Sequence, residues 1–266
     1  MKKFMVFMVL MVGSALFLLQ GSAQAKTFTF NDNTIYWAYT TNNSYMPGWN
    51  SGNSWASSDS SDNTRENIGS PDFPNITAGR GEIDNTGYLT SVSFFYGKGN
   101  TLKSGDVFID VGADNNWDYI ISSGETMGKG GLAQGVYSVN SGSTFSAYKG
   151  SNNGYYILSN AFYSSGHRND HPVAVDASAT ANILSSVDDD ISFVSFDNDT
   201  STPVKFSNLD GIDLDNKPFI IAFAPVCAND VIYERVPEPG VALLLGIGLL
   251  ALGLTSGRRM FVGKEG

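Results

Sequence analysis

Residues 88–96, with the sequence YLTSVSFFY, decide the fold class because their side chains suit the two faces of a strand. In an extended chain, Tyr88, Thr90, Val92 and Phe94 share one face, and Leu89, Ser91, Ser93 and Phe95 share the other. A period of two with mixed polarity is typical of a half-buried strand in an antiparallel sheet. We therefore expect an antiparallel strand here.

Similar short runs of β-branched and aromatic residues recur along the chain, separated by Gly, Asn, Asp and Ser, and none shows helical periodicity. They occupy residues 34–40, 106–111, 117–121, 135–139, 155–159, 172–176, 191–196, 218–224 and 231–236. No proline-rich or serine-rich linker divides them. The sequence predicts an all-β fold, with a single antiparallel domain of the β-sandwich or jelly-roll type over residues 26–236.

The composition excludes several classes of protein. The chain has 266 residues, of which 16% are charged, and its formal net charge is −10. Non-specific nucleic-acid binding needs a basic face, so we expect no nucleic-acid partner. The single cysteine, Cys227, excludes an intramolecular disulfide, and the two histidines offer little for a histidine-rich metal centre.

The N-terminal residues have the three parts of a secretory signal peptide. Lys2 and Lys3 are followed by the uncharged apolar residues 4–19, and Ala23 and Ala25 are the small residues of an A-x-A cleavage site. We expect residues 1–25 to be removed and the mature chain to begin at Lys26. An uncleaved membrane anchor is the alternative.

The C-terminal residues have a second apolar segment. Residues 240–257 contain no charged side chain, and as an α-helix these 18 residues would be about 27 Å long. That length approaches the hydrocarbon thickness of a bilayer, about 30 Å. Arg258 and Arg259 follow, and their charge favours a cytoplasmic location for this end and for the short tail 260–266. The two signals together place residues 26–236 outside the inner membrane.

Residues 237–259 resemble the PEP-CTERM sorting domain of Gram-negative bacteria, which is also called the ice-binding protein C-terminal domain. The resemblance rests on Pro237, Glu238, Pro239 and Gly240, then the apolar helix, then the arginine pair Arg258 and Arg259. It covers about a tenth of the chain, and the tail 260–266 is longer and less basic than such tails usually are. An ordinary single-pass anchor is the alternative.

The resemblance implies a partner and a location. An exosortase-type membrane enzyme would recognise Pro237, Glu238 and Pro239 and process the chain nearby, while the arginine pair would retain the segment during transit. The exported domain would be anchored in the inner membrane during transit. It would then reach the cell surface or the extracellular exopolysaccharide matrix of a biofilm.

Aspartates cluster in two connections that could bind calcium, which prefers oxygen ligands on tight loops. The first candidate set is Asp110, Asp114, Asn116 and Asp118, and its alternative is a hairpin turn capped by aspartates. The second is Asp210, Asp213 and Asp215, with solvated turns as the alternative. It has five further aspartates upstream, which are Asp188, Asp189, Asp190, Asp197 and Asp199. His167, Asp170 and His171 could bind zinc on a helix, but Gly166 and Pro172 favour a loop there. Apart from calcium we expect no cofactor.

Aromatic residues crowd into residues 36–55, which overlap the predicted strand 34–40, and could stack on sugar faces. The candidate glycan contacts are Trp37, Tyr45, Trp49 and Trp55. Packing in the core is the alternative. No nucleophile elbow, phosphate-binding loop or metalloprotease motif is present, so we expect no catalytic role. The sequence favours a structural or matrix-interaction protein. The alternatives are a carbohydrate-binding module and, less favoured, a secreted hydrolase or an ice-binding protein.

Overall fold

The computed structural model describes residues 26–31, 76–96, 103–114, 116–145, 155–158, 172–195, 202–215, 217–226 and 232–237. The predicted signal peptide, residues 1–25, lies outside these ranges, and so do residues 238–266, which hold most of the predicted sorting segment. Within the described ranges, no helix combines the length and the apolar character needed to cross a membrane.

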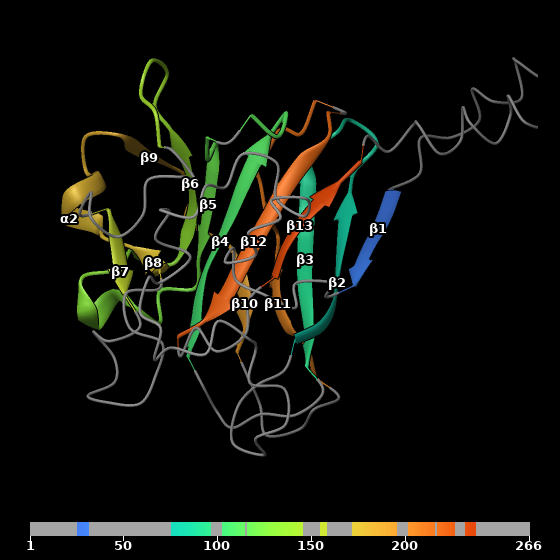
Figure 1. Cartoon of the computed structure of the whole chain (residues 1–266), viewed down its shortest axis with the longest axis horizontal. Helices are drawn as coiled ribbons and strands as arrows, with labels where there is room; N and C mark the ends of the chain where they lie inside the picture. The colour runs from blue at the N-terminus through green and yellow to red at the C-terminus, as the bar shows by residue number, and fades with distance from the viewer. Residues whose placement is uncertain are drawn as a thin grey trace, which may run out of the picture.

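Two antiparallel sheets contain most of the described strands, and Figure 1 shows one in front of the other. The five-stranded sheet has the order β1 (Lys26–Asn31), β2 (Ile76–Ile83), β3 (Leu89–Tyr96), β11 (Val204–Ser207), β10 (Ser192–Val194). The six-stranded sheet has the order β13 (Ile232–Val236), β12 (Phe219–Pro225), β4 (Ser104–Val111), β5 (Tyr119–Ser122), β6 (Gly135–Val139), β9 (Leu184–Asp188). A separate pair is formed by β7 (Tyr156–Leu158) and β8 (Pro172–Val175). The described helical segments are short, η1 (Met127–Lys129) and α2 (Ala177–Thr180).

The inner faces of the two sheets form the main hydrophobic core. Phe94 of β3 stacks on Phe223 of β12 with ring centroids 4.1 Å apart, and Phe206 of β11 meets the Phe223 ring edge-on. The buried cluster combines side chains from both sheets. Burial of such large apolar side chains is the main favourable term in folding. The predicted all-β class, with two packed sheets as in a β-sandwich, is confirmed.

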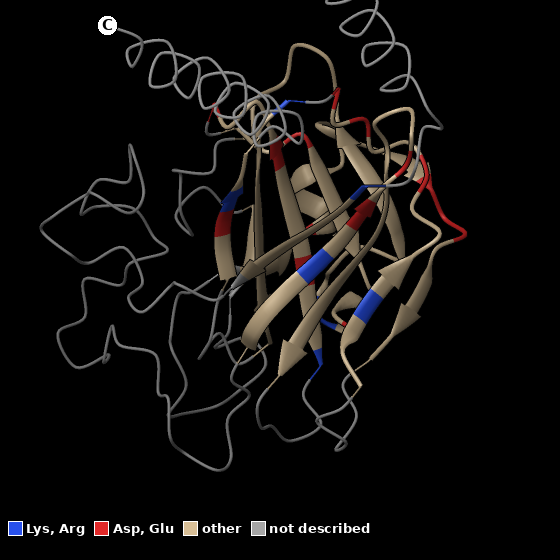
Figure 2. Ribbon diagram, turned by 90° about the vertical axis from the view of Figure 1, so that its right-hand side faces the viewer, with Lys and Arg blue, Asp and Glu red and all other residues tan. Residues whose placement is uncertain are grey.

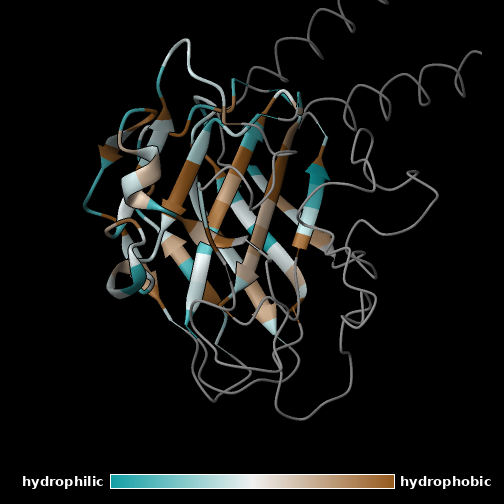
Figure 3. Ribbon diagram, turned by 60° about the vertical axis from the view of Figure 1, so that its left-hand side comes forward, coloured by the Kyte–Doolittle hydropathy of each residue, from teal (hydrophilic) through white to brown (hydrophobic). Residues whose placement is uncertain are grey.

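The six-stranded sheet is buried on its second face as well. Alternate residues of β12 enter the inter-sheet core, and the residues between them enter a second cluster that includes Phe108, Trp117 and Val175. The indole N–H of Trp117 donates to the Tyr156 hydroxyl at 3.1 Å, and this hydrogen bond links the second cluster to β7. In Figure 3, hydrophobic residues, drawn in brown, recur along the strands in the middle of the sandwich. Burial on both faces explains why residues 218–224, PFIIAFA, show no polar alternation.

The predicted faces of residues 88–96 are wrong at Leu89. Strict alternation placed Leu89 on the face of Ser91, but Leu89 is buried in the inter-sheet core with Val92. The pairing of β2 with β3 shifts between Glu82↔Ser91 and Ile83↔Leu89, so that one extra residue of β3 lies between them. Such a β-bulge reverses the alternation, which turns Leu89 inward.

Strand β2 was not predicted because its sequence, ITAGRGEI, contains two glycines, which normally weaken a strand. The structure gives the reason for both. A Cβ atom at Gly79 would come within 3.0 Å of the Phe30 ring, and one at Gly81 would come equally close to the Phe28 ring. The rings of β1 therefore occupy the space above the two glycines, and the glycines let β1 dock against β2.

Candidate functional site

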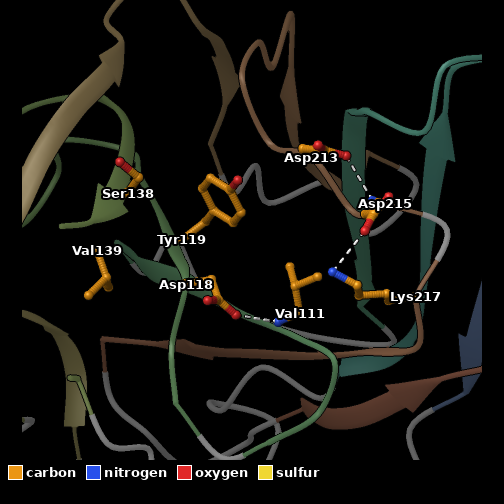
Figure 4. A pocket seen from close by; sticks show the side chains of 8 residues that line it. All are labelled: Val111, Asp118, Tyr119, Ser138, Val139, Asp213, Asp215 and Lys217. Carbon is orange, nitrogen blue, oxygen red and sulfur yellow. Dashed lines mark hydrogen bonds and ion pairs between the residues drawn. The ribbon is translucent and has the colours of Figure 1, made fainter. Parts of the chain in front are cut away.

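A polar pocket of about 320 Å³ opens at the end of the sandwich where β4 ends and β5 begins. Figure 4 shows the side chains that surround it. They come from β4, the β4–β5 connection, β5, β6, and residues 213, 215 and 217 before β12. The lining residues are Val111, Asp118, Tyr119, Ser138, Val139, Asp213, Asp215 and Lys217.

Hydrogen bonds to aspartate side chains stabilise the turn that connects β4 with β5. Gly112 and Ala113 both have positive φ angles, of 93° and 56°, so the chain turns sharply after β4. The Asp118 carboxylate accepts the backbone N–H of Val111 at 2.6 Å. The buried Asp110 carboxylate accepts the backbone N–H of Asp114 at 3.0 Å. Short carboxylates commonly serve as turn acceptors in this way.

The four predicted calcium ligands lie at this turn: Asp110 is near the end of β4, and Asp114, Asn116 and Asp118 are in the connection. The Asp114 carboxylate accepts the backbone N–H of Asn116 at 3.1 Å, so each of the three carboxylates accepts a backbone N–H. Across the described ranges, no group of three or more His, Cys, Asp or Glu side chains is placed to hold a metal ion. These hydrogen bonds fit the alternative of a capped hairpin turn, and calcium binding stays a prediction.

Asp213, Asp215 and Lys217 form the opposite wall of the pocket. Asp215 has a positive φ of 46°, and its backbone N–H donates to the Asp213 carboxylate at 2.8 Å. Lys217 pairs with Asp215 at 2.8 Å, an exposed ion pair of little value to stability. A β-bridge between Asp213 and Tyr88 ties this wall to the five-stranded sheet. Part of the second aspartate cluster therefore meets the first across one pocket.

Burial and charge perturb the ionisable groups of the pocket. Partial burial raises the pKa of Asp118, against the hydrogen bond from Val111, and the nearby charge of Asp114 raises it further. Burial also raises the pKa of Tyr119, so its hydroxyl keeps its proton at neutral pH. The pocket thus offers three carboxyl groups, two hydroxyl groups and one ammonium group. The arrangement suits a ligand that is rich in hydroxyl groups and disfavours an anion.

The structure brings together residues that the sequence did not connect. Tyr119, Ser138 and Lys217 were not predicted as site residues, because they lie on separate elements and meet only through the pairing of β5 with β6 and β4 with β12. In the second predicted aspartate cluster, Asp210 is exposed and does not line the pocket.

Most of the other predicted site residues lie outside the described ranges. Pro237 is described and exposed, directly after β13. The residues outside are Ala23, Ala25, Trp37, Tyr45, Trp49, Trp55, His167, Asp170, His171, Cys227, Glu238, Pro239, Gly240, Arg258 and Arg259.

No family model matches the chain, and no similar protein was found among curated proteins or among solved structures. The resemblance of residues 237–259 to a sorting domain stays a prediction that rests on the residues themselves.

Proposed function

We propose that this chain is an exported protein of the cell surface or extracellular matrix of a Gram-negative bacterium, with a structural or interaction role and no catalytic role. A PEP-CTERM-type signal sorts it, and an exosortase-type enzyme processes it after transit through the inner membrane. One observation supports this proposal most strongly. Among the described residues, the first strand begins at Lys26 and the last ends at Val236, so the described part of the sandwich fits between the two predicted signals.

The same strand boundaries are compatible with both predicted cleavages. A signal peptidase that cuts after Ala25 would leave β1 whole, because β1 pairs with β2 from Lys26 onward. At the other end β13 pairs with β12 as far as Val236, and Pro237 cannot donate a backbone N–H to extend the ladder. Neither processing event would remove part of the folded sandwich.

Mass spectrometry of the mature protein from a Gram-negative host with an exosortase-type enzyme tests this proposal. We expect an N-terminus at Lys26 and a released protein that lacks the apolar segment. The variant Glu238→Ala should keep that segment and remain in the membrane fraction, because the recognition element is damaged. Lys217→Ala, which removes an exposed charge elsewhere, should be processed normally. Recovery of the intact chain from cytosol with Met1 attached would contradict the proposal.

Carbohydrate binding is a second candidate function, and the pocket at the β4–β5 end favours it. Its carboxyl and hydroxyl groups can accept and donate hydrogen bonds to sugar hydroxyls, while Val111, Val139 and the Tyr119 ring provide apolar surface. The carboxyl groups outnumber the single ammonium group, so neutral or amino sugars suit it better than acidic ones.

A glycan array with the full chain tests the second candidate. We expect saturable binding of neutral glycans that is lost in Ser138→Trp, which fills the pocket, and retained in Met127→Ala, which is exposed and lies elsewhere. Binding that survives Ser138→Trp and is lost in the double variant Trp49→Ala/Trp55→Ala would place the glycan on the predicted aromatic residues instead. Absence of saturable binding would remove this candidate.

A further inference from the structure

The strand pair β7–β8 is attached to the six-stranded sheet as a separate unit. Among the described strands, β7 and β8 pair only with each other and join neither main sheet. Tyr156 of β7 and Val175 of β8 are buried in the second cluster together with Phe108 and Trp117. A unit that is docked by side-chain packing and few hydrogen bonds can open while the rest of the fold stays intact.

Asp106 of β4 supplies a hydrogen bond that holds β8 in place. Its Oδ2 accepts the backbone N–H of Val175 at 2.8 Å, a role that a backbone carbonyl has in a regular ladder. Gly105 allows the two strands to approach closely, because a Cβ atom there would come within 3.0 Å of the Val173 carbonyl oxygen. The carboxyl group of Asp106 is therefore enclosed beneath β8.

The enclosed carboxyl group has little to stabilise a negative charge. Asp106 is wholly buried, and its Oδ1 has no hydrogen-bond partner in the described part of the chain. Burial raises its pKa, and the hydrogen bonds from Val175 and from Ser122 of the neighbouring strand β5 offset this only in part. Figure 2 shows that most acidic residues instead lie on loops and strand ends near the top of the view, where water can solvate them.

The titratable groups around Asp106 do not neutralise its charge. Burial raises the pKa of Tyr137 from β6, and the charge of Asp106 raises it further, so that phenol keeps its proton at neutral pH. Burial also raises the pKa of Tyr156 from β7. Asp176, directly after β8, accepts N–H groups of α2, and Glu125, beyond the end of β5, accepts hydrogen bonds from other residues. No charged side chain of the described ranges acts on the Asp106 pKa.

We propose that the protonation of Asp106 controls how firmly the β7–β8 pair docks on the six-stranded sheet. The ionised carboxyl group is kept from water while the pair is docked and becomes hydrated when the pair moves away. Loss of the proton to solvent therefore favours an opened state in which β8 leaves β4 and both main sheets stay folded. The inference does not depend on export or on glycan binding.

The docked pair is held most tightly in acid. In the opened state Asp106 would lose its proton near pH 3.8, whereas in the docked state it keeps the proton until about pH 7. The opening equilibrium should therefore rise about tenfold for each pH unit from about 4 to about 7 and then level off. Opening would expose aromatic surface of Phe108 and Trp117, since the Tyr156 ring lies 6.0 Å from the Phe108 ring and its hydroxyl accepts the Trp117 indole N–H.

Hydrogen exchange followed by mass spectrometry tests the inference on the full chain. After correction for the intrinsic exchange rate, the protection of residues 173–175 should fall about tenfold for each pH unit from about 4 to about 7. Asp106→Asn should give a flat profile, because asparagine has no proton to lose. Asp84→Asn is the matched control and should keep the slope of the wild type, because the Asp84 carboxylate accepts the backbone N–H groups of Thr86 and Tyr88 in the β2–β3 turn.

Urea separates local opening from global unfolding, which would also expose Asp106. Residues 173–175 should be less protected than residues 89–96 of the other sheet, and low urea concentrations should leave their exchange unchanged. Equal protection and equal urea dependence in the two segments would overturn the inference, because the proton would then be lost only on global unfolding. A flat wild-type profile for residues 173–175 would also overturn it, and that result needs no variant to fold. An unchanged slope in Asp106→Asn would assign the titration to another group and reject the inference as well.

Discussion

Replacement of Gly105 by alanine is expected to destabilise the sandwich strongly. Gly105 lies in β4, and a Cβ atom there would come within 3.0 Å of two backbone carbonyl oxygens, those of Val173 in β8 and Ala224 in β12. Backbone atoms held in a sheet cannot rotate away as a side chain can. Overpacking of a core costs about 1–3 kcal/mol, and occasionally more. Because two carbonyl groups would have to move, we expect a loss of at least about 3 kcal/mol from a typical total of about 5–15 kcal/mol.

Urea denaturation followed by circular dichroism would measure this loss, with Gly128→Ala as the matched control. Gly128 lies in the short helix η1, and a Cβ atom there would have no neighbour within 4 Å. The control should therefore be neutral, or more stable by less than about 1 kcal/mol. Equal midpoints for Gly105→Ala and the wild type would show that β8 does not pack on β4 as described.

Replacement of Asp106 by asparagine is expected to stabilise the protein at neutral and alkaline pH. Asp106 is fully buried beneath β8, and its carboxyl group accepts the backbone N–H of Val175 at 2.8 Å. Burial raises its pKa to about 7, despite hydrogen bonds from Val175 and Ser122. The ionised form is therefore costly in the folded state, and asparagine can keep the acceptor without the charge.

The sign of the pH dependence follows from that pKa. An unfolded chain loses the Asp106 proton near pH 3.8, whereas the folded protein keeps it until about pH 7. Folding is thus favoured most below about pH 4 as far as this group is concerned, and stability falls as the pH rises from about 4 to about 7. At 1.36 kcal/mol for each pKa unit, the loss is on the order of 4 kcal/mol.

Denaturant titrations at several pH values would test this prediction. The difference in unfolding free energy between Asp106→Asn and the wild type should be small near pH 4 and should grow until about pH 7. Asp176→Asn is a useful comparison, because hydrogen bonds from Ser178 and Ala179 lower the pKa of that helix-capping carboxyl group. That variant should instead lose stability above about pH 4. A pH-independent difference for Asp106→Asn would show that the buried carboxyl group does not titrate as described.

A strand was predictable where its own residues formed a run of β-branched and aromatic side chains. The runs at residues 106–111, 135–139, 218–224 and 231–236 coincide with β4, β6, β12 and β13 to within one or two residues. Strand β2 was missed because its glycines make sense only once the Phe28 and Phe30 rings of β1 lie above them. The inward turn of Leu89 was missed because a β-bulge depends on how two strands pair.

In the candidate site, too, the local features were predictable from the sequence and the long-range contacts were not. The tight turn with Asp110, Asp114 and Asp118 was visible in the sequence as a local cluster, with the capped hairpin as one of its two interpretations. Its neighbourhood with Lys217 was not visible, because about a hundred residues separate the two and only the pairing of β4 with β12 joins them. Contacts between residues so far apart in the sequence leave no periodic pattern from which they could be predicted.

The sequence by itself determined the all-β class and the antiparallel strands, because alternation and turn residues act over a few neighbouring positions. It also supplied the two apolar segments on which the export proposal rests. Only the tertiary structure decided that one sheet is buried on both faces, that a pocket forms at one end, and that β1 begins and β13 ends on that side of the sandwich. Those features depend on the order in which strands pair, and hydrogen bonds between strands can join residues that are far apart in the chain.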